Sequence, residues 1–167
     1  MSNLFNLIIA AAIYGSPLFA GITDHGPIRD HENGHTHMEK GHLLTAAGYP
    51  GRISDVNQKI HVSLGPNMSF SPAEFKFNQG DTIRFYIFNH DKLKHEFVIG
   101  DKAEMREHAA LMRSMPETKH DEGNAVTLKP GEIRQMTWTF SKKGIFEAAC
   151  HLPGHYEEGM KAVVEVI

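Results

Sequence analysis

The chain has 167 residues, of which 41% are hydrophobic and 22% are charged, proportions typical of one soluble globular domain. The formal net charge of −3 is small, and no basic stripe of the kind that binds nucleic acid is present in the sequence. There are 12 histidines but only one cysteine, Cys150, which cannot form an internal disulfide and is therefore a buried side chain, a reactive thiol or a metal ligand.

Residues 1–20 are predicted to form a secretory signal peptide. They contain no Asp, Glu, Lys or Arg, carry an apolar run over residues 7–14, and end at the small residue Ala20, where we expect cleavage. An uncleaved anchor is the alternative, but this run is too short to cross a hydrocarbon core of about 30 Å. We therefore expect an exported protein with no membrane span in its mature form.

Residues 21–56 are rich in Gly, His, Asp and Glu and lack apolar periodicity, which predicts a flexible, His-rich leader. Within it, His35, His37 and Met38 could bind Cu(II) through imidazole, or Cu(I) through imidazole and thioether. The alternative is a solvated leader that binds metal only adventitiously. Composition alone does not separate the two interpretations.

From residue 57 to residue 167 the sequence changes to short segments rich in Val, Ile, Phe and Thr, separated by turns that contain Gly, Pro, Asn or Asp. Ile83, Phe85 and Ile87 alternate with polar residues in one such segment, as expected for a strand with one buried face. About eight segments of this kind predict an all-β domain, an antiparallel Greek-key sandwich or barrel. The segments read KIHVSLG, AEFKF, DTIRFYIFN, HEFVIG, AVTLKPG, EIRQMTWTF, GIFEAAC and KAVVEVI.

One segment, residues 102–115, has strong helix formers and ends before Pro116, which predicts a short helix inserted between two strands. Met105, His108, Met112 and Met115 recur on one side of this helix. Such a stripe can simply pack the helix against the sheet. The alternative is a second site for Cu(I), which accepts thioether and imidazole ligands.

The last strands enclose the motif CHLPGHYEEGM, in which Cys150, His155 and Met160 are separated by four residues each. Pro153 and Gly154 can turn the loop back on itself and bring the three side chains together. A blue copper site needs one thiolate, two imidazoles and a weak axial methionine, so one histidine is missing from the loop. Either His95, at the start of a strand, or His90, in the preceding loop, could supply it, and a strand would hold a ligand more rigidly.

The segments FNQGDTIRFYIFN, HEFVIG and CHLPGHYEEGM resemble the cupredoxins, the plastocyanin and azurin superfamily, over about residues 59–167. With its His-rich leader and Met-bearing helix, the chain is most similar to periplasmic cupredoxin-like proteins of bacterial copper tolerance. The resemblance implies a periplasmic location and one type 1 copper ion bound by His95, Cys150, His155 and Met160. Glu96 stands where plastocyanin and azurin usually have Asn, which affects a usual tie between the two ligand loops.

Other kinds of site fit the sequence less well. A single cysteine excludes a dinuclear copper centre of the oxidase-subunit type, and Ala149 stands where a multicopper oxidase has a histidine. Met160 would be a poor zinc ligand, and the strand and loop setting of Cys150 favours ligation over nucleophilic catalysis.

The sequence therefore predicts a non-enzymatic, monomeric, redox-active copper protein that acts in copper tolerance, with copper ions and a redox or copper-trafficking protein as partners. The alternative is a small electron carrier dedicated to a respiratory or other redox chain.

Overall fold

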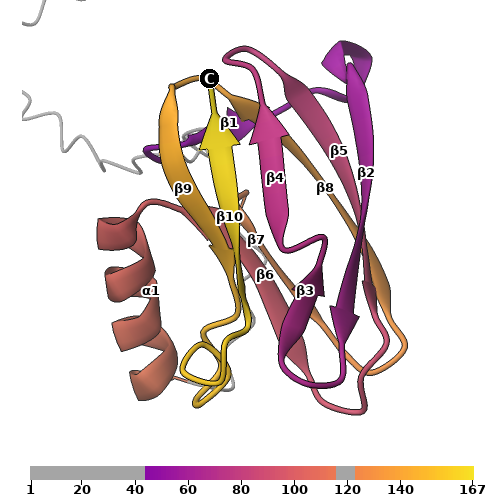
Figure 1. Ribbon diagram of the computed structural model, residues 1–167, viewed down its shortest axis with the longest axis vertical. Coiled ribbons are helices and arrows are strands. Elements are labelled where there is room, and N and C mark those ends of the chain that lie inside the picture. Colours follow the sequence, from indigo (N-terminus) through magenta and orange to yellow (C-terminus); the bar gives the residue numbers. More distant parts are fainter. Residues whose placement is uncertain (1–43, 116–122) are drawn as a thin grey trace, which may run out of the picture. The chain divides into compact units, whose positions relative to one another are not determined.

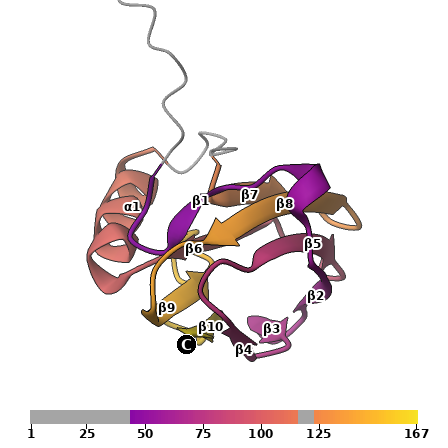
Figure 2. The same cartoon turned by 90° about the horizontal axis from the view of Figure 1, so that it is seen from above.

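The structure, a computed structural model, describes residues 44–115 and 123–167. Two five-stranded sheets face each other, one with the strand order β1-β8-β5-β2-β3 and the other β4-β10-β9-β6-β7 (Figures 1 and 2). Within these described residues there is one α-helix, α1, which follows β6 and precedes β7. The prediction of an all-β sandwich with one inserted helix is confirmed.

The first sheet contains β1 (Gly48–Pro50), β2 (Gln58–Gly65), β3 (Ser69–Ser71), β5 (Thr82–Asn89) and β8 (Ile133–Phe140). The second contains β4 (Glu74–Phe77), β6 (His95–Gly100), β7 (Ala125–Leu128), β9 (Gly144–Ala149) and β10 (Lys161–Val166). The helical elements are α1 (Lys102–Ser114) and a short 3-10 helix, η1 (Ile53–Asp55).

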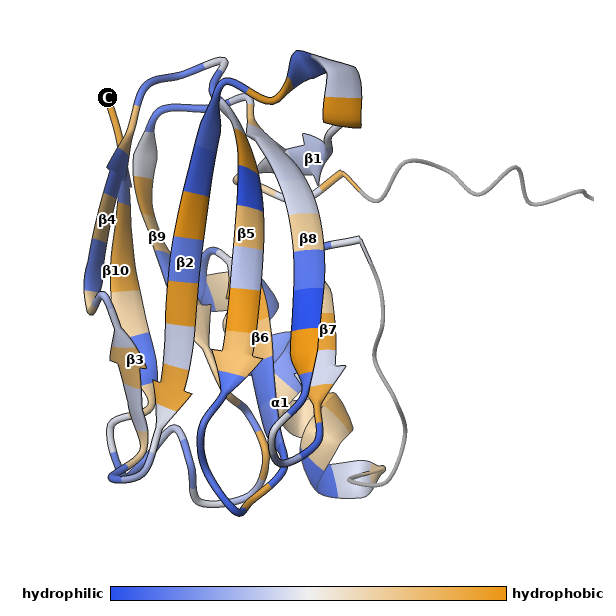
Figure 3. Cartoon of the chain, turned by 90° about the vertical axis from the view of Figure 1, so that its right-hand side faces the viewer, coloured by the Kyte–Doolittle hydropathy of each residue, from blue (hydrophilic) through white to orange (hydrophobic). Residues whose placement is uncertain are grey.

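The core lies between the sheets and follows the alternation of the strands. Figure 3 shows apolar and polar residues alternating along β2 and β5. Ile83, Phe85 and Ile87 of β5 are buried, as the sequence predicted, and Trp138 of β8 is completely buried. Burial of each such side chain contributes roughly 1.5–3 kcal/mol, so the sandwich is a rigid support for residues at its end.

Strand β6 is buried along its whole length because both of its faces are covered. The core covers one face, and α1 packs against β6 and β9 on the outer side of the second sheet (Figures 1 and 2). The helix begins with a capping box, in which the Asp101 side chain accepts the backbone N–H of Glu104 and the Glu104 side chain accepts that of Asp101. Glu104 also accepts the backbone N–H of Ala46, which ties the start of α1 to the segment before β1.

Three features differ from the sequence prediction. Strands β1 and β3 were not expected, because three-residue strands carry too little alternation to be recognised. Residues 48–50 pair with β8, so this part of the segment 21–56 belongs to the sheet and not to a flexible leader. Two pairs, β2 with β5 and β4 with β10, are parallel, whereas an antiparallel arrangement was predicted.

Several predictions fall on other parts of the chain. The signal peptide at residues 1–20 and the candidate ligands His35, His37 and Met38 lie outside the described residues. Within residues 44–115 and 123–167, no helix has the length and apolar character needed to cross a membrane.

Candidate metal centre

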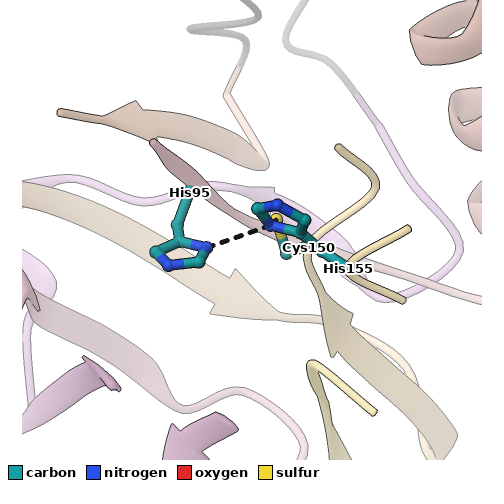
Figure 4. A group of neighbouring side chains, drawn as sticks. All are labelled: His95, Cys150 and His155. Carbon is teal, nitrogen blue, oxygen red and sulfur yellow. Dashed lines mark hydrogen bonds between the residues drawn. The ribbon is translucent and has the colours of Figure 1, made fainter. Parts of the chain in front are cut away.

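Three of the predicted ligands, His95, Cys150 and His155, meet at one end of the sandwich (Figure 4). Their donor atoms all lie within 4.8 Å of one another. The Nδ1 atoms of His95 and His155 are 3.1 Å apart, and Cys150 Sγ lies 3.4 Å from His155 Nδ1. By contrast, His90, the alternative to His95, is exposed and packs its ring against Phe88, so the structure selects His95 for this cluster.

His95 is the first residue of β6 and is completely buried. Its Nε2 lies 3.1 Å from Asp91 Oδ2, within hydrogen-bond distance. A proton on Nε2 that is donated to Asp91 leaves the lone pair of Nδ1 facing Cys150 and His155, which is how carboxylates orient histidines at metal sites. The hydrogen bond from His95 also holds the pKa of Asp91 below its usual range.

The loop that carries Asp91 is fixed by Asn89, the last residue of β5, which is completely buried. The Asn89 side-chain amide donates to the carbonyl oxygens of Leu93 and Leu128, and its Oδ1 accepts the backbone N–H of Asp91. Asp91 and Asn89 were not identified from the sequence. The only signal was a polar loop, NHDKLK, directly before His95, and such loops are common.

Cys150 follows β9 and is completely buried. Burial raises the pKa of its thiol to about 12, while the backbone N–H of Glu96, 3.3 Å from Sγ, acts in the opposite direction. This contact joins the start of β6 to the end of β9. The tie between the two ligand segments, which the replacement of Asn by Glu96 had placed in question, is therefore made by the backbone.

The loop after Cys150 is closed by backbone hydrogen bonds. The N–H of Cys150 donates to the Met160 carbonyl, and the N–H of Met160 donates to the His155 carbonyl, both at 3.0 Å. Gly154 and Gly159 have φ values of +88° and +105°, which L side chains rarely adopt. The loop thus holds the backbones of Cys150, His155 and Met160 together, and the Met160 side chain is buried in the same core cluster as Cys150.

His155 is half-buried, unlike His95 and Cys150. Burial and the nearby His95 lower its pKa, so its imidazole is neutral and able to bind a metal at neutral pH. Two imidazole nitrogens and one thiol sulfur that face one another form a soft, nitrogen- and sulfur-based donor set. These residues fit a copper ion, with the buried thioether of Met160 as the available fourth group.

A second cluster of polar and sulfur side chains lies under α1. His151 Nε2 lies 3.2 Å from Met105 Sδ, and the rings of His151 and His108 are 5.7 Å apart between centroids. Glu96 Oε2 lies 3.5 Å from His108 Nε2. We call these four residues, Glu96, Met105, His108 and His151, the helix cluster.

The predicted stripe on the helix is therefore divided. Met105 and His108 belong to the helix cluster, whereas Met112 packs in the main core and Met115 is 47% exposed. The position of Met112 agrees with the first interpretation of the stripe, in which its methionines pack the helix against the sheet. The partners of Met105 and His108 come from β6 and from the residue after Cys150, which no pattern on the helix itself could indicate.

A family model described as copper-binding proteins of the plastocyanin/azurin family matches residues 56–167. Among curated proteins, the chain is 35% identical over 149 residues to the copper-resistant cuproprotein CopI of Rubrivivax gelatinosus, covering 89% of this chain and 90% of the relative. It is 32% identical over 164 residues to the protein of the same name from Vibrio cholerae, with 96% of each chain covered.

Solved structures show the same fold. Auracyanin B has a TM-score of 0.60 and 19% identity, with 74% of this chain and 96% of that chain covered. The auracyanin of Roseiflexus castenholzii has a TM-score of 0.57 and 24% identity, with 67% of this chain and 98% of that chain covered.

Proposed function

Because the chain belongs to the plastocyanin/azurin family of copper-binding proteins, we propose that it is a periplasmic type 1 copper protein that acts in copper tolerance. The observation that carries the proposal is the convergence of His95 Nδ1, Cys150 Sγ and His155 Nδ1 at the end of a rigid sandwich. Relatives named as copper-resistant cuproproteins, which match almost the whole chain, support the role in tolerance.

Each site residue has a distinct role in this proposal. Cys150 provides the thiolate, His95 and His155 provide imidazole nitrogens, and Met160 provides a weak axial sulfur. Asp91 and the backbone N–H of Glu96 hold His95 and Cys150 in place. When bound, copper supplies a one-electron Cu(II)/Cu(I) couple and a thiolate-to-copper charge-transfer band.

Rigidity matters because the same ligands must suit both oxidation states. His95 and Cys150 lie at the ends of strands in a packed sheet, and backbone hydrogen bonds fix the loop of His155 and Met160. Such a site needs little rearrangement when an electron arrives or leaves. The proposal assigns the protein no catalytic reaction.

A dedicated electron carrier is the second candidate. His155 favours it, because this imidazole is half-buried while the other predicted ligands are buried, so it offers an exit for an electron toward a partner protein. Export of the mature chain after cleavage near Ala20 is part of both proposals and rests on the sequence of residues 1–20.

The first experiment is a Cu(II) titration of the mature protein followed by visible absorption. We expect an intense charge-transfer band that saturates at one equivalent and is absent from the Cys150→Ser variant. A band of equal intensity in that variant would contradict the ligand assignment.

The second experiment separates the two roles. A strain that lacks the gene should grow poorly in high copper and recover when the wild-type gene is returned. Normal growth in high copper would rule out the tolerance role and favour the carrier.

A further inference from the structure

We propose that the helix cluster is a second metal site, which binds Cu(I) through Met105 Sδ and the imidazoles of His151 and His108. It lies between α1 and the outer face of the second sheet, apart from the type 1 ligands. The proposal concerns other side chains than the type 1 assignment and does not depend on it.

Two of the donor atoms are close enough to contact one ion, and the separation of the two imidazole rings is compatible with the same ion. His151 Nε2 and Met105 Sδ lie 3.2 Å apart, so a single ion can contact both with little movement. Two imidazoles that bind one ion at about 2.0 Å per bond have centroids roughly 5–6 Å apart. The His108 and His151 rings, at 5.7 Å and 62° between their planes, fall in this range.

The chemistry of the donors selects the ion. Thioether sulfur is a soft ligand that favours Cu(I), whereas zinc sites in proteins use thiolate, imidazole and carboxylate. Met105 is 3% exposed and its sulfur contacts His151 Nε2, so the thioether lies inside the cluster and not on the exposed surface of the helix.

Glu96 gives independent support. Its carboxylate is 1% exposed, and neither oxygen accepts a hydrogen bond within the described part of the chain. A buried carboxylate is costly unless a positive charge lies nearby. The carboxylate contacts His108 Nε2 at 3.5 Å. A cation bound by the His108 and His151 imidazoles would therefore place a positive charge near the Glu96 carboxylate.

A path from solvent also exists. A groove of about 410 Å³ between α1 and the turn after Cys150 is lined by Met105, His151 and Tyr156. The Tyr156 ring stacks on His151 with centroids 4.9 Å apart and holds the imidazole at the groove wall. An ion can therefore reach Met105 and His151 without unfolding of the sandwich.

The test uses the full chain carrying Cys150→Ser, which removes the type 1 thiolate, and follows the eight methionine methyl groups by NMR during an anaerobic Cu(I) titration. We expect the Met105 methyl signal to shift and to saturate at one equivalent. Residual binding at the type 1 position would instead move Met160, so the two sites are read separately. An unshifted Met105 signal would overturn the proposal.

A pair of variants supplies the matched control. Met105→Leu and Met112→Leu make the same chemical change on the same helix, and each conserves volume, so both should fold. Both variants are made in the chain that carries Cys150→Ser and compete for Cu(I) with a coloured chelator. Met105→Leu should lose at least about tenfold in affinity for one equivalent of Cu(I), while Met112→Leu should bind as tightly as the chain that carries Cys150→Ser alone. Equal affinities in the two variants would refute the site, as would a titration in which Zn(II) but not Cu(I) binds the helix cluster.

Discussion

Asp91 is the residue through which the type 1 assignment can be tested without touching a ligand. Its carboxylate lies 3.1 Å from His95 Nε2 and fixes the orientation of the imidazole. Replacing it with Ala frees the ring to rotate and removes the charge that stabilises the ligand. Replacing it with Asn removes the charge but keeps an oxygen that can accept the Nε2 proton.

The structure sets the expected size of the effect. Loss of a partner that orients a metal-binding histidine typically costs 10- to 100-fold in metal affinity. Because Asp91 lies in a loop and is only half-buried, water can partly replace it, so we expect about tenfold for Asp91→Ala. Asp91→Asn should fall between Asp91→Ala and the wild type.

The assay is competition for Cu(II) against a chelator of known affinity, with the charge-transfer band as the readout. Lys92→Ala is the control, because Lys92 is the next residue of the same loop and is exposed. If Asp91→Ala binds copper within twofold of Lys92→Ala, the orienting role of Asp91 is wrong. A shift of the absorption band in Asp91→Ala would indicate that ligand orientation, and not loop stability alone, has changed.

Three further predictions concern the ligand loop and its neighbours. Met160→Leu should keep the blue colour and raise the reduction potential, measured by redox titration, because a weak axial donor is lost; an unchanged potential would argue against axial ligation. Gly159→Ala should cost roughly 1–2 kcal/mol in denaturant unfolding, since φ is +105° and no neighbour contacts an added Cβ; an unchanged midpoint would contradict this. Burial lowers the pKa of His151 to about 4, so the unfolded state binds more protons between pH 4 and about 6.5, and the metal-free protein should lose stability as the pH falls through this window. Because the ring lines an open groove, we expect this loss of stability to be roughly 1–2 kcal/mol and to be absent in His151→Gln. Equal pH profiles of stability for the two proteins would refute the lowered pKa of His151.

The sequence predicted the parts of the molecule that depend on local pattern. Alternation in β5 identified its buried face. The spacing of Cys150, His155 and Met160 predicted a loop that brings these three residues together, and their backbones are joined by hydrogen bonds. Asp91 could not be identified, because one carboxylate in a polar loop becomes informative only when the fold places it beside His95.

The helix cluster shows why the remainder required the structure. On the helix, Met105 and Met112 are equivalent members of one stripe, and only the placement of α1 against β6 and β9 separates them. Which methionine meets a histidine depends on contacts between residues 46 positions apart, Met105 and His151. No local pattern contains that information.

Strand alternation explains how two donor sets arise from neighbouring residues. His95 and Cys150 point into the end of the sandwich, so the residues that follow them, Glu96 and His151, point to the opposite face of the second sheet. In a sandwich with that face open to water, these two polar side chains would be solvated and unremarkable. The inserted helix covers the face, buries Glu96 and His151, and brings Met105 to them. One insertion between β6 and β7 thus places the outward neighbours of the predicted type 1 ligands His95 and Cys150 next to Met105, which gives the donors of the second site that we propose.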